Sequence, residues 1–301
     1  YGGMMNAIGL QNPGIDLFCK RDIPYLKNYD TKIIVNVCGH APEEYLEVVE
    51  RLADEPIDMM EINISCPNVK EGGIAFGQVP ASAEAITKAV KKVAKQPVIM
   101  KLSPNVTDIT EMAKAAEAGG ADAISLINTL TGMKIDINRR TFALANKTGG
   151  MSGPAVKPVA VRMVYQVANA VNIPIIGMGG IASAEDALEF IMAGATMVAV
   201  GTANFNDPMT TIKVIEGIQS FMKKNGIRCL LFQRRWLKTY LMMKFLILFL
   251  CISSFQLSAN VYSQIAKVSL EVTLRKDLFV FWLPNRTSSP LPPQTKKESL
   301  S

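Results

Sequence analysis

The sequence is short of histidine and of clustered cysteine, and each shortage excludes a kind of chemistry. His40 is the only histidine in 301 residues, which disfavours a Ser-His-Asp triad and a histidine-based metal site. The five cysteines are scattered, so they form neither a disulfide framework nor a CxxC zinc site, and we expect no bound metal. Any general base is therefore expected to be another residue type.

Charge is also scarce, and it is unevenly distributed. Charged residues make up 19% of the chain and apolar residues 49%, a composition typical of a globular protein and not of a disordered or fibrous one. Residues 1–226 hold 21 Lys+Arg and 23 Asp+Glu, whereas residues 227–301 hold 11 and 3. The basic excess lies in the tail, so the body shows no signature of nucleic-acid binding, and a domain boundary is expected near residue 226.

The body alternates between two patterns. Apolar, β-branched runs predict strands at 32–39, 59–67, 97–104, 123–130, 173–180 and 197–204. Amphipathic stretches predict helices at 42–55, 81–95, 107–118, 155–171, 184–193 and 208–224. The strands are apolar on both faces, as parallel strands covered by helices are. Strict alternation therefore predicts a parallel α/β fold.

Two architectures fit this alternation: a doubly wound sheet and a (β/α)8 TIM barrel. We favour the barrel. The chain begins YGGMMNAIGL, without a lead-in, so the six units are interpreted as a TIM barrel lacking its first two strand–helix units. Such a barrel would not close, and its edge strands are expected to be exposed.

Residues 227–301 do not continue the alternation and are interpreted as an unrelated basic tail. Basic residues there precede an apolar run and then small polar residues, which is the layout of a secretory signal peptide. The run is too short for a membrane span. A join to a neighbouring gene is our favoured interpretation, and a genuine amphipathic or membrane-surface segment is the alternative. The Pro/Ser/Lys-rich end, 285–301, is expected to be disordered.

A TIM barrel carries its active site at the C-terminal ends of its strands. In this sequence those ends are polar or glycine-rich: Asn36, Ser65–Asn68, Lys101, Asn128–Thr129, Gly179–Gly180 and Gly201–Thr202. The last two suit a phosphate group, because small residues expose backbone N–H groups and the following helices add partial positive charge. Simple turns are the alternative reading of the same glycines.

Two strand-end residues are candidates for chemistry. Lys101 could be a salt-bridge partner, a Schiff-base amine, a cation beside an anionic ligand, or a solvated side chain. Cys66 opens the glycine-rich loop CPNVKEGGIAFGQ and could accept a proton or act as a nucleophile. An inert core cysteine is the alternative for Cys66, and it is our interpretation of the other four cysteines.

Seven motifs in order carry a resemblance to a known family: NAIGLQNPG, INISCPNVKEGG, KLSPNVTDI, INTLTGMKID, SGPAVKP, GMGGI and VGTANF. Together they resemble dihydroorotate dehydrogenase, in particular the class 1B catalytic subunit, over residues 1–226. The resemblance implies oxidation of dihydroorotate to orotate in pyrimidine biosynthesis, with FMN on this chain. It also implies a cytoplasmic homodimer that pairs with a partner subunit. That partner would carry FAD and a [2Fe–2S] cluster and pass electrons to NAD.

The resemblance also implies residue roles. Cys66 matches the family's catalytic base, which removes the proton from C5 of the substrate while hydride leaves C6 for FMN. The implied substrate-binding residues are Asn6, Ala7, Ile8, Gly9, Leu10, Asn63, Asn68, Asn128 and Thr129. The implied FMN-binding residues are Asn36, Asn63, Lys101, Ile127, Gly153, Gly179, Gly180, Gly201 and Thr202.

Three other functions stay open at the level of sequence. One is another FMN barrel acting on pyrimidine rings, similar to dihydropyrimidine dehydrogenase. A second is an inactive fragment, because the family's first segment is absent. A third is a phosphate-binding isomerase without flavin, which is disfavoured because such enzymes usually use carboxylate bases and no strand end here carries one.

Overall fold

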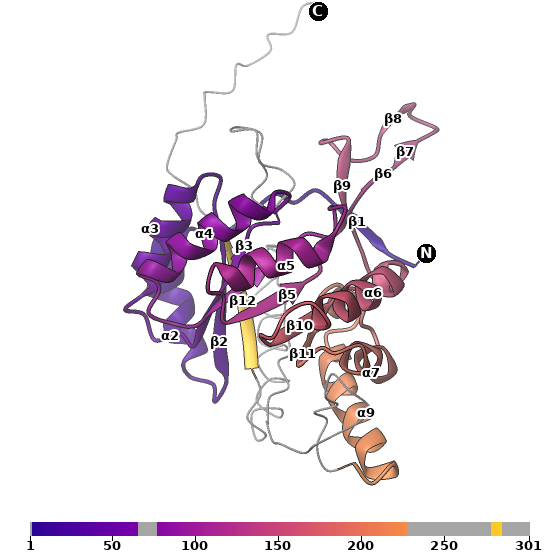
Figure 1. Cartoon of the computed structure of the whole chain (residues 1–301). Coiled ribbons are helices and arrows are strands. Elements are labelled where there is room, and N and C mark those ends of the chain that lie inside the picture. Colours follow the sequence, from indigo (N-terminus) through magenta and orange to yellow (C-terminus); the bar gives the residue numbers. More distant parts are fainter. Residues whose placement is uncertain (1, 66–76, 228–277, 285–301) are drawn as a thin grey trace, which may run out of the picture.

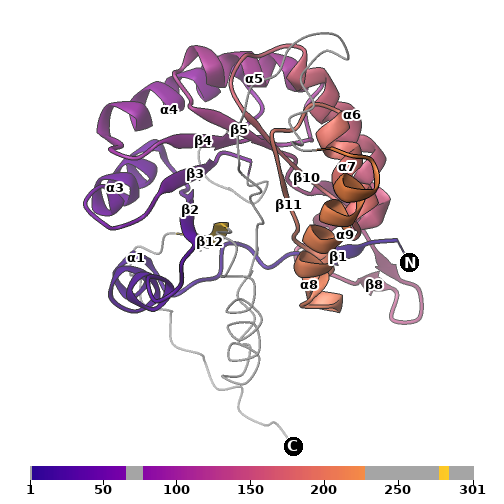
Figure 2. The same cartoon turned by 90° about the horizontal axis from the view of Figure 1, so that it is seen from below.

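The computed structural model describes residues 2–65 and 77–227 and the backbone of residues 278–284. Its centre is a curved sheet with helices along its outer side (Figures 1 and 2). The strands follow the order β11-β10-β5-β4-β3-β2-β12, and every neighbouring pair is parallel. The predicted parallel α/β architecture of the TIM-barrel type is therefore confirmed. How many units complete the barrel stays a prediction.

All six predicted strands are present, and each is shorter than the apolar run that predicted it. They are β2 (Lys32–Cys38), β3 (Met59–Asn63), β4 (Val98–Lys101), β5 (Ala123–Leu126), β10 (Ile175–Met178) and β11 (Met197–Ala199). The helices that follow them are α3 (Pro42–Leu52), α4 (Pro80–Val93), α5 (Ile109–Ala118), α6 (Lys157–Ala168), α7 (Ala184–Met192) and α9 (Thr210–Lys224). The six predicted helices are confirmed as well.

Alternation along each strand separates two apolar cores. Side chains such as Ile33, Val35 and Ile62 face the helices and belong to the larger core. Their neighbours on the other face form a smaller cluster inside the curved sheet, built from Ile34, Ile99, Ala123, Ile176, Met197 and Ala199. The inner face of the sheet is thus apolar beneath the C-terminal ends of the strands, and the polar residues described below lie directly above this apolar cluster.

Two parts of the fold were not predicted. Before β2, a helical segment runs through α1 (Ile15–Leu17), a π-helical turn η1 (Phe18–Asp22) and α2 (Ile23–Leu26). Between β5 and α6, the chain leaves the barrel and forms short antiparallel strands: β6 (Leu130–Met133), β7 (Ile135–Asp136), β8 (Thr141–Phe142) and β9 (Thr148–Ser152). β9 also pairs with the N-terminal strand β1 (Met4–Asn6).

The incomplete barrel was expected to leave its edge strands exposed, and at β2 this expectation is wrong. The backbone of β12 (Leu278–Pro284) runs parallel to β2, from Leu278 beside Lys32 to Pro284 beside Cys38. The signal-peptide-like segment and the Pro/Ser/Lys-rich end of the predicted tail lie outside the described residues. Within the described ranges, no helix is both long and apolar enough to span a membrane.

A substitution at Gly194 tests how closely α6 packs against the turn that precedes β11. Its φ is +112°, and an added Cβ would lie 2.5 Å from Ala168 Cβ. We expect Gly194→Ala to lower the free energy of unfolding by about 3 kcal/mol, from the left-handed backbone and overpacking together. Gly226 is the matched control, because its φ of +65° is also left-handed but nothing lies within 4 Å.

Gly226→Ala should therefore cost only about 1 kcal/mol. Urea unfolding of both variants against the wild type measures the difference. Equal losses in the two variants would show that the contact with Ala168 does not constrain the packing.

Candidate active site

The inner face of the sheet changes from apolar to polar toward the C-terminal ends of its strands. Above the apolar cluster, Asn36 of β2 lies beside Glu61 of β3, and Lys101 of β4 lies beside Ser125 of β5. These four side chains are buried, and all come from positions that alternate with the outward-facing core residues. The barrel therefore has a polar layer under its rim.

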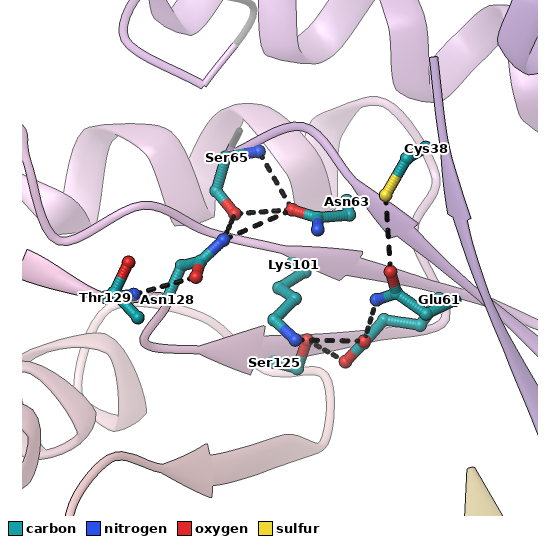
Figure 3. Close-up of polar contacts among 9 residues, drawn as sticks. Cys38, Glu61, Asn63, Ser65, Lys101, Ser125, Asn128 and Thr129 are labelled. Atoms are coloured by element: carbon teal, nitrogen blue, oxygen red, sulfur yellow. Dashed lines mark hydrogen bonds and ion pairs between the residues drawn. The ribbon is translucent and has the colours of Figure 1, made fainter. Parts of the chain in front are cut away.

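The carboxylate of Glu61 contacts the other three side chains of this layer (Figure 3). Its Oε2 accepts a hydrogen bond from Asn36 Nδ2, and its Oε1 accepts one from Ser125 Oγ at 2.6 Å. Lys101 Nζ lies 3.4 Å from Glu61 Oε2. The side chain of Glu61 is 1% exposed and that of Lys101 is 10% exposed. The sequence left several roles open for Lys101. The structure shows one of them directly, because Lys101 is the salt-bridge partner of Glu61.

Sequence reasoning missed Glu61. The sequence-based argument against an isomerase noted that no strand end carries a carboxylate, and Glu61 is indeed two residues short of the end of β3. A signal was available: in MMEIN, Glu61 and Asn63 fall on one face of a strand that is otherwise apolar. A charged residue at such a position has to be paired inside the barrel.

A second polar group lies at the rim, where β3 and β5 end (Figure 3). Ser65 Oγ donates to Asn63 Oδ1 at 2.6 Å and lies 2.6 Å from Asn128 Nδ2, from which it accepts. Asn128 Oδ1 in turn accepts from the backbone N–H of Thr129 at 2.7 Å. Three of the predicted substrate-binding residues, Asn63, Asn128 and Thr129, are thus brought together. Ser65 is the bridging residue, and it was missing from the predicted set.

Further contacts hold this rim group in place. Tyr45 of α3 is 2% exposed and donates from its hydroxyl to the backbone carbonyl of Asn63 at 2.9 Å. Asn105 Nδ2 donates to the backbone carbonyl of Thr129 at 3.0 Å. The backbone of Asn63 and that of Thr129 are therefore each held by a side chain from a neighbouring segment. Neither Tyr45 nor Asn105 was predicted.

The predicted phosphate-binding glycines also converge. A Cβ on Gly180 would lie 2.7 Å from the carbonyl oxygen of Gly153, and one on Gly179 would lie 3.2 Å from Ile127 Cγ1. Thr202 Oγ1 donates to Ser152 Oγ at 2.8 Å, which brings the end of β11 to the residue before Gly153. Sequence-distant segments thus meet at the ends of β10 and β11.

Packing and conformation explain why Gly179 and Gly180 are glycines. Their φ angles are +125° and +87°, and added Cβ atoms would meet Ala160 and Lys157 at 2.9 Å. The glycines alone therefore do not demonstrate a phosphate site. The stronger observation is that the N–H groups of Gly180, Ile181 and Thr202 have no hydrogen-bond acceptor among the described residues.

The helix termini contribute less to this region than we expected. The first N–H groups of α7 are satisfied by its own capping box, in which Ser183 and Asp186 bond to each other's backbone N–H groups. Asp186 also accepts from Lys157 Nζ at 2.6 Å, and Glu189 accepts from the same nitrogen at 2.6 Å. α8 (Ala203–Asn206) has only 4 residues. Anion binding here would depend on backbone N–H groups more than on helix dipoles.

The remaining predicted residues are distributed as follows. Asn6 is the last residue of β1 and pairs with Gly150 of β9. Gly150 in turn packs against Thr129, because a Cβ on it would lie 2.2 Å from Thr129 Oγ1. Ala7, Ile8, Gly9 and Leu10 follow in the loop after β1, and their role stays a prediction. Gly201 lies directly after β11. Cys66 and Asn68 lie outside the described residues.

Comparisons with known proteins agree with one another. The family described as dihydroorotate dehydrogenase matches residues 1–222. The chain is 75% identical over 227 residues to the dihydroorotate dehydrogenase B (NAD(+)) catalytic subunit of Lachnoclostridium phytofermentans, covering 75% of this chain and 76% of the relative. It is 65% identical over 228 residues to the protein of the same name from Alkaliphilus metalliredigens, covering 76% of each.

A solved structure shows the same fold. The crystal structure of DHODH from Eimeria tenella, in complex with ferulenol, superposes with a TM-score of 0.64. Its sequence is 22% identical, and the match covers 76% of this chain and 70% of that one. At this identity the likeness supports the fold alone.

The Lys157–Asp186 contact gives a prediction about acid stability. Burial alone would raise the pKa of Asp186, but hydrogen bonds from Lys157 and from the backbone N–H groups of Ala182 and Ser183 leave that pKa below its ordinary value. A carboxyl whose pKa is lower in the folded than in the unfolded protein contributes stability at neutral pH. That contribution is lost as the pH falls through the folded pKa.

We expect Asp186→Asn to lower the melting temperature at pH 7, and to lose less further stability than the wild type between about pH 5 and pH 2. Thermal melts across this range provide the measurement. Asp54→Asn is the control, because Asp54 is 85% exposed and its ion pair with Lys95 lies at the surface. Parallel pH profiles for the wild type and Asp186→Asn would contradict the assignment.

Proposed function

The chain belongs to the dihydroorotate dehydrogenase family, and on that premise we propose that it is a catalytic subunit that oxidises dihydroorotate to orotate in pyrimidine biosynthesis. It is thus an FMN-dependent oxidoreductase acting on CH–CH groups. The observation that carries the proposal is the meeting of Asn63, Ser65, Asn128 and Thr129 at the rim. These residues come from the ends of two strands, where barrel enzymes bind their substrates.

The rim group suits the substrate's ring. Dihydroorotate presents amide N–H and carbonyl groups in alternation, and an asparagine amide supplies both a donor and an acceptor. Asn63 and Asn128 are oriented by Ser65, and Thr129 is held through the backbone contact to Asn105. Because these side chains are already supported by the protein, little conformational entropy would be lost when the ring binds.

The residues beneath and beside the rim fit FMN. Lys101 and Asn36 offer a cation and an amide in the polar layer, where Glu61 holds both. The N–H groups of Gly180, Ile181 and Thr202 have no acceptor among the described residues, which suits a phosphate group. Ile127 packs beside Gly179, between the two regions. We assign cofactor binding to these residues with Asn63, Gly153 and Gly201.

Within this site we assign different roles to Cys66 and Lys101. We assign to Cys66 the role that the family resemblance implies for it, which is to accept the proton from C5 of dihydroorotate. Bound FMN would accept the hydride from C6. Lys101 supplies fixed positive charge beside the cofactor, which favours the more negative reduced form.

The onward path of electrons requires a second protein. The sequence holds no cysteine cluster that could bind iron and sulfur, and its relatives are named as catalytic subunits of an NAD(+) enzyme. We propose that a partner subunit with FAD and a [2Fe–2S] cluster passes electrons to NAD, and that the catalytic subunit is a homodimer. We assign this activity to residues 1–226 and none to residues 227–301.

A visible spectrum tests the proposal directly. The purified 301-residue chain, supplied with FMN, should show flavin absorbance that bleaches when L-dihydroorotate is added without oxygen. Dihydrouracil serves as the control, because it has the same ring without the carboxylate. Bleaching by dihydrouracil alone would move the substrate to pyrimidines without a carboxylate, and a protein that binds no flavin would overturn the assignment.

Variants of Cys66 test the base. Cys66→Ala should reduce turnover by at least about 100-fold while FMN stays bound, because general-base catalysis is lost. Cys66→Ser should be slow and should recover at high pH, because a hydroxyl is the weaker acid and is harder to ionise. Cys19→Ala is the control, since Cys19 is buried in the core near the N-terminus. Near-normal turnover in Cys66→Ala would remove Cys66 as the base.

A further inference from the structure

Glu61 stands out among the residues that the proposed function leaves without a role. It is the only acidic residue in the six strands β2, β3, β4, β5, β10 and β11. Its side chain is 1% exposed and lies inside the barrel, directly above the apolar cluster. Placing a carboxylate there is unfavourable unless it is paired and hydrogen-bonded.

The structure meets this requirement with three donors. Asn36 Nδ2 and Lys101 Nζ approach Oε2, and Ser125 Oγ donates to Oε1. The amide nitrogen and the ammonium can only donate, so their common partner has to accept from both. A carboxylate does this, whereas a glutamine would offer an NH2 group to one side of the same cluster.

Stability alone is a weak reason for such a pair. Replacing a buried ion pair by apolar side chains of similar volume is often neutral or stabilising. Glu61 does have a clear geometric consequence, because its carboxylate holds two side chains from different strands at fixed places under the rim. Those two, Asn36 and Lys101, are residues to which we assign cofactor binding.

We propose that Glu61 is a positioning residue that sets the reduction potential of the bound FMN. This inference rests on the proposed function. Glu61 fixes the Lys101 ammonium and the Asn36 amide, and its negative charge offsets much of the positive charge that Lys101 would otherwise present to the cofactor. Since the reduced cofactor carries more negative charge than the oxidised one, this offset keeps the reduction potential lower than Lys101 alone would set it.

The test is the midpoint potential of FMN on the 301-residue chain, measured by reductive titration against a reference dye. Glu61→Gln should raise the potential, because the negative charge of Glu61 then no longer offsets the positive charge of Lys101. We expect reduced FMN to gain about tenfold in affinity relative to oxidised FMN, which equals about 30 mV for a two-electron couple. Glu84→Gln is the matched control, because Glu84 pairs with Lys88 on the outer helix α4.

A second pair of variants covers the case in which Glu61→Gln does not fold. Lys101→Met should lower the potential, since it leaves the carboxylate without its cation. Adding Glu61→Gln to Lys101→Met should move the potential back toward the wild-type value. A purely structural role for Glu61 would not produce opposite shifts that cancel.

The outcomes separate this inference from the proposed function. FMN that binds with the wild-type potential in Glu61→Gln, or a double variant that stays at the potential of Lys101→Met, would overturn the role of Glu61 alone. A wild-type chain that binds no FMN would overturn the proposed function and this inference together. FMN affinity, measured by fluorescence quenching, should weaken in Glu61→Gln if Asn36 and Lys101 lose their fixed positions.

Discussion

The buried contact between Glu61 and Lys101 constrains the rest of the candidate site. An apolar barrel interior tolerates charge only when every charged group has partners, and here Glu61 of β3 finds its partners on β2, β4 and β5. Asn36, Ser125 and Lys101 cannot move independently, because each bonds to the same carboxylate. The rim residues above them therefore stand on a rigid base, as a site built on strands requires.

The end of β5 connects the two halves of the site. Ile127 packs beside Gly179 in the glycine region, and the next residue, Asn128, bonds to Ser65 in the rim group. One peptide unit thus spans the proposed cofactor region and the proposed substrate region. After Thr129 the chain leaves the barrel as β6 and returns as β9, which brings Gly150 against Thr129 and Ser152 against Thr202.

The sequence predicted the repeating part of the fold well, because each strand–helix unit repeats the same local pattern. It missed the segment from Ile15 to Leu26 and the excursion from β6 to β9, since these depend on contacts with distant parts of the chain and not on local periodicity. The expectation of an open edge at β2 was wrong for the same reason. Pairing with Leu278–Pro284 joins residues that lie more than two hundred positions apart in the sequence.

The site was predicted unevenly. Strand-end residues such as Asn63 and Lys101 follow from the rule that barrels carry function at the C-terminal ends of their strands. Glu61 was missed, and Ser65 was noted only as part of a polar strand end, because the roles of a mid-strand acid and a bridging hydroxyl become clear only once their partners are placed. The glycines were read as a phosphate site, yet backbone conformation and close packing already account for Gly179 and Gly180.

A crystal structure of the chain with FMN and orotate tests the central claim most directly. The account predicts the orotate ring against Asn63, Asn128 and Thr129, the FMN phosphate at the N–H groups of Gly180 and Thr202, and Lys101 still paired with Glu61 beneath the cofactor. Orotate or FMN bound elsewhere on the chain, or a Lys101 turned away from Glu61 in the complex, would contradict it.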